Sequence, residues 1–444
     1  IGYTVVVAHH ADIGGRVPGG SGADSREIFE EGLRMPPIHL RRRSEWNQAL
    51  IDVLRANVRL PDAIWGDLQA QLAACAIGSR ELTAILDRHG RSTYEELSQR
   101  IIDYSRTALL SVLRSWPAGT YEFTDYEDHD GINDRRVPIH VSVRIQPDGV
   151  EFDFTGTADQ VEGSINCTLS FTESACYAAI RALCPEEIPV NAGFIEPIRV
   201  IAHPGTLVNA RFPAGVAARG IVGFRTIDTI FGALSRALPD RVPAAGDGGT
   251  TGVRFGGYRP DGTRFQCNDI ISGVWGARPA ADGLDGAANM AANIANRPIE
   301  IAELEDPVRF HAYEFVPDTG GPGKFRGGLA LRRRIELLAD SAVFSLRSHR
   351  RVTPPFGLDG GSPGQTSATF LVRDGVKELM PAKTTARLRK GDIIEHVTSS
   401  GGGVGPSPDR DPQHIERDLA EEKITARHAE EIYGYRSATE LKPA

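Results

Sequence analysis

The spacing of hydrophobic positions changes several times along the chain, and each change predicts a different kind of element. A valine-rich apolar run at residues 3–7 is typical of a β-strand. From residue 44 to residue 116 apolar side chains recur every three or four positions, which predicts amphipathic helices. We expect these helices to begin near Ser44, Pro61, Gly78 and Tyr94.

Alternation of apolar and polar residues replaces the helical spacing after residue 119. It runs through residues 139–145, stops at the Pro-Asp-Gly turn at 147–149 and resumes at 150–154, so we expect a β-hairpin. Helices are predicted at 169–183 and 220–238, with a strand at 198–201. The middle of the chain is therefore α+β rather than a regular βαβ alternation.

Glycine is frequent from residue 246 to about residue 405. Aromatic and β-branched residues recur between the glycines, as at 308–315 and 342–346, which favours a β-rich body over a disordered linker. Residues 411–433 show helical spacing among charged residues and predict a pair of short surface helices.

These patterns predict an α+β protein, a mixed α/β chain of several subdomains with a helical subdomain and a β-rich, glycine-rich C-terminal body. The 444 residues are too many for a single hydrophobic core. We expect five parts: residues 1–43, a strand and a metal-binding glycine-rich loop that is N-terminally incomplete; 44–118, a helical subdomain; 119–245, an α+β subdomain; 246–405, a glycine-rich β-rich subdomain; and 406–444, a C-terminal helical tail.

Composition narrows the class of protein. The net charge is -8 and no basic run exceeds three residues, so a nucleic-acid groove has no electrostatic support. No apolar run reaches the roughly 18–20 residues that span a bilayer, and no signal peptide is evident, so we expect a cytoplasmic protein with no membrane partner. The five cysteines are scattered, which suits a reducing compartment, and Cys176 and Cys184 are predicted to be buried thiols.

The strongest chemical signal lies at residues 8–15, Ala-His-His-Ala-Asp-Ile-Gly-Gly. Imidazole nitrogen and carboxylate oxygen together suit Zn²⁺ or Mn²⁺. On an extended strand His9 and His10 point to opposite sides, whereas His10 and Asp12 share one side. A strand cap followed by an Asx turn at Asp12 explains the pattern equally well, and a metal would need a third ligand from elsewhere.

Other glycine-rich stretches leave alternatives open. Residues 14–15 and 19–22 could offer backbone amides to an anion, but no phosphate-binding loop or dinucleotide motif is present, which favours turn glycines. Residues 318–328 combine a carboxylate, two cations and several glycines. They could position an anionic substrate group or a partner's loop, or they could form a tight structural turn. No Gly-x-Ser-x-Gly nucleophile motif is present.

The apolar run at residues 3–7 begins almost at Ile1. A lone strand is not stable, so we expect its pairing partners later in this chain, in another chain, or in a segment that has been removed.

Several stretches agree with one family. Residues 9–15 (His-His-Ala-Asp-Ile-Gly-Gly) and 318–328 (Asp-Thr-Gly-Gly-Pro-Gly-Lys-Phe-Arg-Gly-Gly) are the most specific of them. Further matching stretches lie at 28–34, 57–61, 66–74, 153–157, 296–300 and 401–403. Together they resemble the B-type subunit of the hydantoinase/oxoprolinase family over essentially the whole chain.

The resemblance implies a subunit of an ATP-dependent enzyme that acts on cyclic amides such as hydantoins, oxoproline or lactams, or of the related acetone and acetophenone carboxylases. In that family an A-type subunit with an actin-like ATPase fold binds ATP and phosphorylates the carbonyl oxygen of the substrate. The B-type subunit carries a metal site at which the activated intermediate meets water or bicarbonate. A metal-bound water with a pKa near 7 is the physical reason for a metal in the hydrolytic branch.

The resemblance also assigns site residues. It implies that His10 is a ligand of a divalent metal, zinc or manganese, with Asp12 and His9 in support. Family members normally carry a preceding Gly-Gly-x-His-x-x-Asp motif that completes the site, and this sequence starts after it. We expect a separate chain or processed fragment to supply that segment, or this chain alone to bind metal weakly.

The sequence therefore predicts the metal-containing subunit of an ATP-dependent cyclic-amide hydrolase. Its expected partners are an A-type ATPase subunit in a hetero-oligomer and a small-molecule substrate. No catalytic residue is assigned, and ATP is expected on the partner. The alternatives are a subunit of a ketone carboxylase and a non-catalytic assembly subunit.

Overall fold

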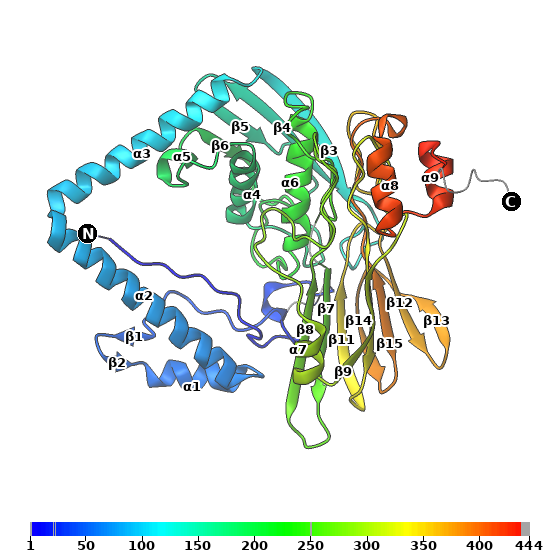
Figure 1. Cartoon of the computed structure of the whole chain (residues 1–444). Coiled ribbons are helices and arrows are strands. Elements are labelled where there is room, and N and C mark those ends of the chain that lie inside the picture. The colour runs from blue at the N-terminus through cyan, green and yellow to red at the C-terminus, as the bar shows by residue number, and fades with distance from the viewer. Residues whose placement is uncertain (1, 21, 23, 249–250, 437–444) are drawn as a thin grey trace.

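A four-stranded sheet and the helices packed on it form the upper part of the molecule in the computed structural model, which describes residues 2–20, 22, 24–248 and 251–436 (Figure 1). The sheet order is β3 (Gly119–Glu127), β4 (Val137–Gln146), β5 (Gly149–Asp153) and β6 (Ile198–Ile201). Strand β6 pairs with β5 in parallel, and the other pairs are antiparallel. The predicted hairpin is confirmed as β4–β5, because every second side chain of β4 is buried.

Helix α6 (Gly220–Leu234) is the central helix of this upper part. It packs against β3, β4 and α4 (Leu169–Ala182), whereas the short α5 (Ala192–Ile195) packs against α3 (Arg91–Arg114). Nearly all its residues are buried, as is expected of a helix that is covered on all sides. Cys176 of α4 is fully buried and Cys184 partly so, and burial raises the pKa of both thiols.

Two sheets packed face to face form the lower part. The first has the order β14 (Lys383–Arg389), β11 (Ser341–Arg347), β7 (Thr251–Tyr258), β8 (Arg264–Ile271). The second has the order β13 (Val376–Leu379), β12 (Ala368–Arg373), β15 (Ile393–Val397), β10 (Leu331–Leu337), β9 (Val308–Phe315), and α7 (Ile299–Glu305) precedes β9. Their facing apolar side chains build a second core. The α+β prediction with a β-rich C-terminal body is thus confirmed.

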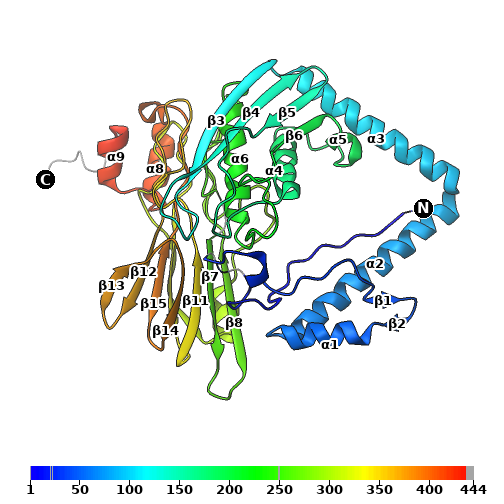
Figure 2. The same cartoon turned by 180° about the vertical axis from the view of Figure 1, so that it is seen from behind.

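Helices α2 (Pro61–His89) and α3 (Arg91–Arg114) form an arch that stands away from the body, with α1 (Gln48–Asn57) and the short strands β1 (Arg41–Arg42) and β2 (Glu45–Trp46) at its lower end (Figures 1 and 2). They meet at Gly90, whose φ is 78°. The predicted helix start at Gly78 is wrong, because α2 runs unbroken through that residue.

The segment at residues 3–7, predicted as a strand, has no strand partner among the described residues. Pairing with another chain or with a removed segment stays a prediction. The segment is extended but forms no ladder with any described strand, and it runs along α2 under the arch (Figure 2). Side chains of α2 make the contacts instead: Gln71 Nε2 donates to the Val6 carbonyl over 3.4 Å, and Cys75 Sγ lies 3.8 Å from the Thr4 carbonyl. A helix surface offers no free backbone donors, so the segment cannot form a β-ladder with α2.

The C-terminal prediction is confirmed. The one-turn helix η2 (Ser407–Asp409) leads into α8 (Pro412–Ala420) and α9 (Ala426–Tyr433), which pack on the side of the body opposite the arch (Figure 1). Asp318 accepts hydrogen bonds from the backbone N and Oγ1 of Thr425 at 2.7 and 2.8 Å, and buried Arg326 lies 3.2 Å from Asp418 of α8. Residues 318–328 thus form a tight structural turn that holds the tail.

None of the helices in the described ranges is long and apolar enough to cross a membrane. The division of the chain into five parts stays a prediction.

Candidate active site at the N-terminal loop

Asp12 organises the loop that carries the two histidines. Its carboxylate is fully buried and accepts four hydrogen bonds: from the backbone N of Gly14 (3.3 Å), Gly19 (3.2 Å) and Arg59 (2.7 Å), and from Nη1 of Arg59 (2.8 Å). Arg59 also donates to the Gly15 carbonyl over 2.7 Å. The bond to Gly14 closes the expected Asx turn, and both oxygens of Asp12 are occupied.

The glycines of this loop allow other backbone segments to lie very close to it. A Cβ at Gly14, whose φ is 86°, would lie 2.6 Å from the Asn57 carbonyl oxygen, and a Cβ at Gly20 would lie 2.6 Å from that of Glu31. The Gly20 amide donates to the Val17 carbonyl over 3.0 Å. The turn interpretation therefore fits better than an anion-binding loop, although Ser21 lies outside the described residues.

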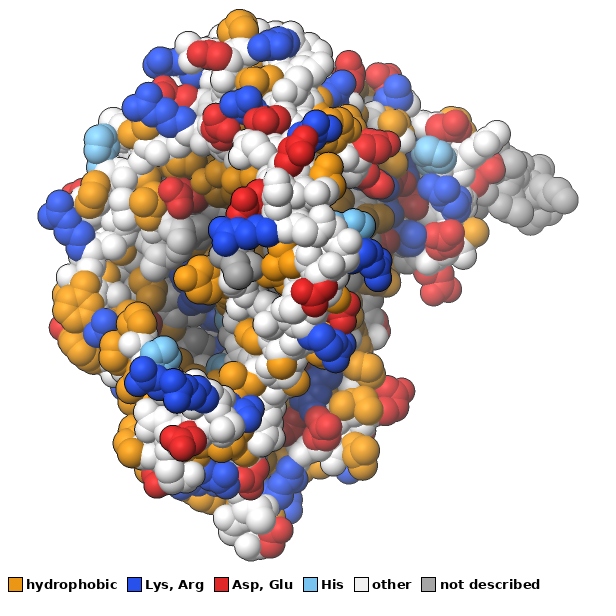
Figure 3. All heavy atoms as spheres, turned by 90° about the vertical axis from the view of Figure 1, so that its left-hand side faces the viewer, with side chains coloured by type: hydrophobic (Ala, Val, Ile, Leu, Met, Phe, Trp, Pro, Cys, Tyr) orange, Lys and Arg blue, Asp and Glu red, His pale blue; other side chains and the backbone are white. Residues whose placement is uncertain are grey.

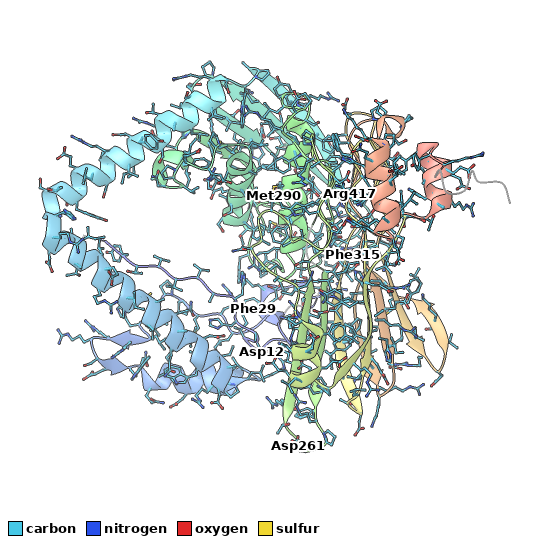
Figure 4. All side chains as sticks on the ribbon, viewed as in Figure 1. Asp12, Phe29, Asp261, Met290, Phe315 and Arg417 are labelled. Carbon is cyan, nitrogen blue, oxygen red and sulfur yellow. The ribbon has the colours of Figure 1, made fainter. Side chains whose placement is uncertain are left out.

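His10 faces a carboxylate from the arch. Its Nδ1 lies 3.2 Å from Oδ2 of Asp67 on α2, and the side chains are 17% and 49% exposed. A histidine held at one ring nitrogen keeps the other for a ligand, and an acidic partner fixes the ring orientation. His9 is exposed. Figure 4 shows Asp12, two residues from His10, at the foot of the arch close to Phe29.

The fit of a metal to these residues is partial. A catalytic zinc site uses about three protein ligands. Within the described ranges no group of three or more His, Cys, Asp and Glu side chains is placed to hold a metal ion. His10 and Asp67 suit a borderline cation as two ligands, whereas Asp12 has no free oxygen. The assignment of His10, Asp12 and His9 to a metal stays a prediction.

Sequence reasoning missed two residues of this site, Asp67 and Arg59. Both lie in stretches that carry the family resemblance, at 66–74 and 57–61, but no local pattern assigns them a role. Their partners are 57 and 47 residues away in the chain, so the pairing depends on how α2 passes the loop.

The loop is fixed to the lower sheet and to the start of α6. Gln266 of β8 donates to the Ala11 carbonyl over 2.7 Å, and Thr385 of β14 donates to Asp24 over 2.9 Å. Beyond the one-turn helix η1 (Ile28–Glu30), Glu31 accepts from the backbone N of Val216 and Ala217 at 2.7 and 2.9 Å. Burial raises the pKa of Glu31 to about 7.

A hollow opens on the arch side of the molecule (Figure 3). A groove of about 670 Å³ is lined by Trp275, Tyr313 and residues 286–290 and 292–296, a size that suits a small-molecule ligand. A cavity of about 20 Å³ adjoins it and is lined by Asp228 and Met290 among others. Burial raises the pKa of Asp228 to about 6. In Figure 4 Met290 lies above Asp12.

The loop and its surroundings match a known family. The sequence agrees with the model of the family described as Hydantoinase B/oxoprolinase over residues 1–407. The chain belongs to this family.

One relative and two solved structures show how similar this chain is to known proteins. A protein of Pseudomonas sp. (strain NS671), provisionally named as the B-type subunit of a D-/L-hydantoinase, is 32% identical over 449 residues, which cover 98% of this chain and 75% of that protein. The crystal structure of ATP-dependent caprolactamase from Pseudomonas jessenii superimposes with a TM-score of 0.87 at 27% identity, over 97% of this chain and 76% of that one. Nucleotide-free acetone carboxylase gives a TM-score of 0.88 at 18% identity, over 97% and 65%, and shares the fold.

Proposed function

We propose that this hydantoinase B chain is the metal-containing subunit of an ATP-dependent hydrolase of cyclic amides such as hydantoins, oxoproline or lactams. It acts on a substrate that a partner ATPase subunit has phosphorylated. The observation that carries the proposal is the likeness to ATP-dependent caprolactamase over 97% of this chain. The name of the Pseudomonas relative, which is that of one subunit of a hydantoinase, supports the same reaction class and an assembly of unlike subunits.

The residues of the N-terminal loop have different proposed roles. Asp12 and Arg59 hold the loop in shape, so that His10 stands beside Asp67 at the foot of the arch. His10 is the proposed ligand of zinc or manganese, Asp67 orients its ring or shares the metal, and His9 supports from the exposed side. A bound metal would supply a water whose pKa is near 7. The remaining ligands would come from outside the described residues.

The test begins with co-purification of the tagged chain with its partner, which we expect to be an A-type, actin-like ATPase. ATP hydrolysis and ring opening are then measured with lactams, hydantoins, oxoproline, and ketones with bicarbonate. We expect ATP hydrolysis that depends on a cyclic amide and is matched by ring-opened product. ATP hydrolysis that responds to no cyclic amide would refute the proposal, and a response to ketone and bicarbonate alone would assign carboxylation instead.

Metal content of the same complex tests the role of His10. We expect stoichiometric zinc or manganese in the native complex and less than a tenth of it in His10→Ala, with ring opening lost in parallel. His89→Ala, on the exposed last turn of α2, is the matched control and should keep both. A metal-free complex with full activity would exclude the metal role.

A further inference from the structure

The lower sheet turns a polar face toward the N-terminal loop, and that face carries arginines. Arg347 of β11 pairs in register with Gly252 of β7, so Arg254, two residues along β7, lies on the same face. The opposite face sends Val253 and Leu346 into the core between the two sheets. A Cβ at Gly252 would lie 2.8 Å from Nε of Arg347, so glycine leaves the space that this guanidinium occupies.

Two covering segments enclose these side chains. From the N-terminal loop, Gly19 lies against Arg254, whose Cδ would be 3.2 Å from a Cβ at that glycine. From the turn before α6, the Ala217 carbonyl accepts from Nη1 of Arg347 over 3.2 Å, and Arg219 follows two residues later. The arginine cluster, Arg219, Arg254 and Arg347, therefore lies where the loop, the sheet and the start of α6 meet.

Two members of the cluster, Arg347 and Arg219, have no ion-pair partner among the described residues, although the carboxyl group of Glu31 interacts with Arg219 from a greater distance. No carboxylate of those residues lies within 4.0 Å of the guanidinium of Arg347 or Arg219, and Nε of Arg347 is buried with no hydrogen-bond partner among them. By contrast Lys383, which pairs with Arg347 in register, has Glu127 at 3.6 Å. Burial and the neighbouring Arg219 lower the pKa of Arg347 to about 10, and burial and Arg347 lower the pKa of Arg254.

Nε of Arg347 is buried without a partner, and a guanidinium that has lost part of its water without gaining a counter-ion is costly. An oxyanion that enters the cluster removes the cost. Guanidinium forks match the oxygens of a phosphate in pairs, and several of them around one group favour a dianion. Arg219 and Arg347 are each partly exposed, so a solute can reach them.

We propose that the arginine cluster binds a phosphate group, and that during turnover this is the phosphoryl group of the activated cyclic amide. The assignment of the source rests on the proposed function, whereas the binding of phosphate does not. The loop that carries His10 lies on the same sheet face, through Gln266 and the Ala11 carbonyl. The cluster thus holds the phosphoryl end of a substrate whose ring faces the histidine.

The first experiment titrates inorganic phosphate into the full chain by calorimetry. We expect one site, weakened at least tenfold in Arg347→Met and less in Arg347→Lys, which keeps the charge without the fork. Arg387→Met is the control, since Arg387 lies on the same face of β14 at its exposed end, and it should change the affinity less than twofold. Absence of phosphate binding, or equal loss in Arg347→Met and Arg387→Met, would overturn the proposal.

Thermal unfolding separates binding from a structural role. Without phosphate, the Tm of Arg347→Met should equal or exceed that of the native chain, because an unbalanced cation has been removed. Phosphate should raise the Tm of the native chain but not that of Arg347→Met. A Tm that falls with and without phosphate, while the phosphate-induced rise persists, would show that Arg347 is structural.

The assembled complex distinguishes the two sources of phosphate. If the ligand is the phosphoryl group of the substrate, Arg347→Met uncouples the reaction, so that ATP is consumed with at least tenfold less ring opening. If only free phosphate binds, inhibition by phosphate is lost while coupling is unchanged, which would overturn the assignment of the source. A complex with no amide-dependent ATP hydrolysis at all would refute the proposed function and leave the phosphate site to the titration.

Discussion

At the scale of single residues, buried charges in this protein act mainly as organisers. Asp12 is the clearest case. The sequence suggests that it is a metal ligand, but both of its carboxylate oxygens accept hydrogen bonds from two glycine amides and from Arg59. Removal of one member of such a buried pair generally costs more than the pair contributes. The carboxylate therefore shapes the loop that presents His10.

Glu31 makes stability depend on pH. Its pKa is about 7 in the folded chain against 4.5 in a free side chain. Burial raises the pKa by more than the two hydrogen bonds from backbone N–H groups lower it. Between these values the folded state holds the proton and the unfolded state does not, so stability falls as the pH rises from about 4.5 to 7. At 1.36 kcal/mol per pKa unit the loss is about 3 kcal/mol.

Glu31→Gln should remove this loss, because the amide stays neutral and still accepts hydrogen bonds. Urea unfolding should show the variant about 3 kcal/mol more stable than the native chain at pH 8 and close to it at pH 4.5. A difference that is the same at both pH values would contradict the assignment.

At the scale of elements, the arch shows how a helix replaces a strand partner. The segment at residues 3–7 is rich in valine, yet Tyr3, Val5 and Val7 are 97%, 79% and 86% exposed. Gly78, which reads as a helix break, lies inside α2 at the point where Thr4 approaches; a Cβ there would be 2.6 Å from Thr4 Cγ2. The glycine provides a close contact between segments and does not end the helix.

Gly78→Ala should therefore displace the N-terminal segment from α2. We expect faster proteolysis and hydrogen exchange in residues 2–9, because the added Cβ would occupy the position of the Thr4 methyl group. Gly66→Ala is the matched control: it lies on the same helix with no atom within 4 Å of its Cβ, and alanine should add about 0.5–1 kcal/mol of helix stability there. Equal exchange in the two variants would show that Thr4 yields without cost.

At the scale of the whole molecule, a buried charge network joins the upper part to the lower double sheet. Glu127 at the end of β3 lies 3.0 Å from Nη2 of Arg225 on α6 and 3.6 Å from Nζ of Lys383 on β14. All these side chains are fully buried. Close by, Asp128 accepts from the backbone N of Thr353 over 2.8 Å, in the loop after β11.

Glu127→Gln should lower the free energy of unfolding by about 3–5 kcal/mol, because it leaves Lys383 buried without its carboxylate and Arg225 with only the more distant Asp125, at 3.6 Å. Lys383→Met should cost less, and the double variant less than the sum, since each change removes the same contact. Denaturant unfolding of the native chain and the three variants measures the coupling. Glu95→Gln, in the exposed pair with Arg91, should cost less than about 1 kcal/mol, and a similar small effect of Glu127→Gln would contradict the role of the network.

The sequence predicts the elements whose pattern is local and misses what depends on distant neighbours. The β4–β5 hairpin and the helices α3, α4 and α6 follow from regular spacing over ten or more residues. Residues 3–7 are extended but have no strand partner among the described residues, because a valine-rich run specifies an extended backbone but not a sheet edge to pair with. For the same reason His10 is visible in the sequence, whereas its contact with Asp67 is visible only once α2 is in place.

The arch also has a mechanical consequence. Gly90, where α2 and α3 join, has no atom within 4 Å of the position of a Cβ, so no side-chain packing braces the corner at this residue. Asp67 lies about 35 Å along α2 from this corner, at 1.5 Å per residue. A rotation of about ten degrees at Gly90 would carry Asp67 roughly 6 Å, about twice its present distance from His10. A small change of the angle between α2 and α3 at Gly90 would therefore separate Asp67 from His10.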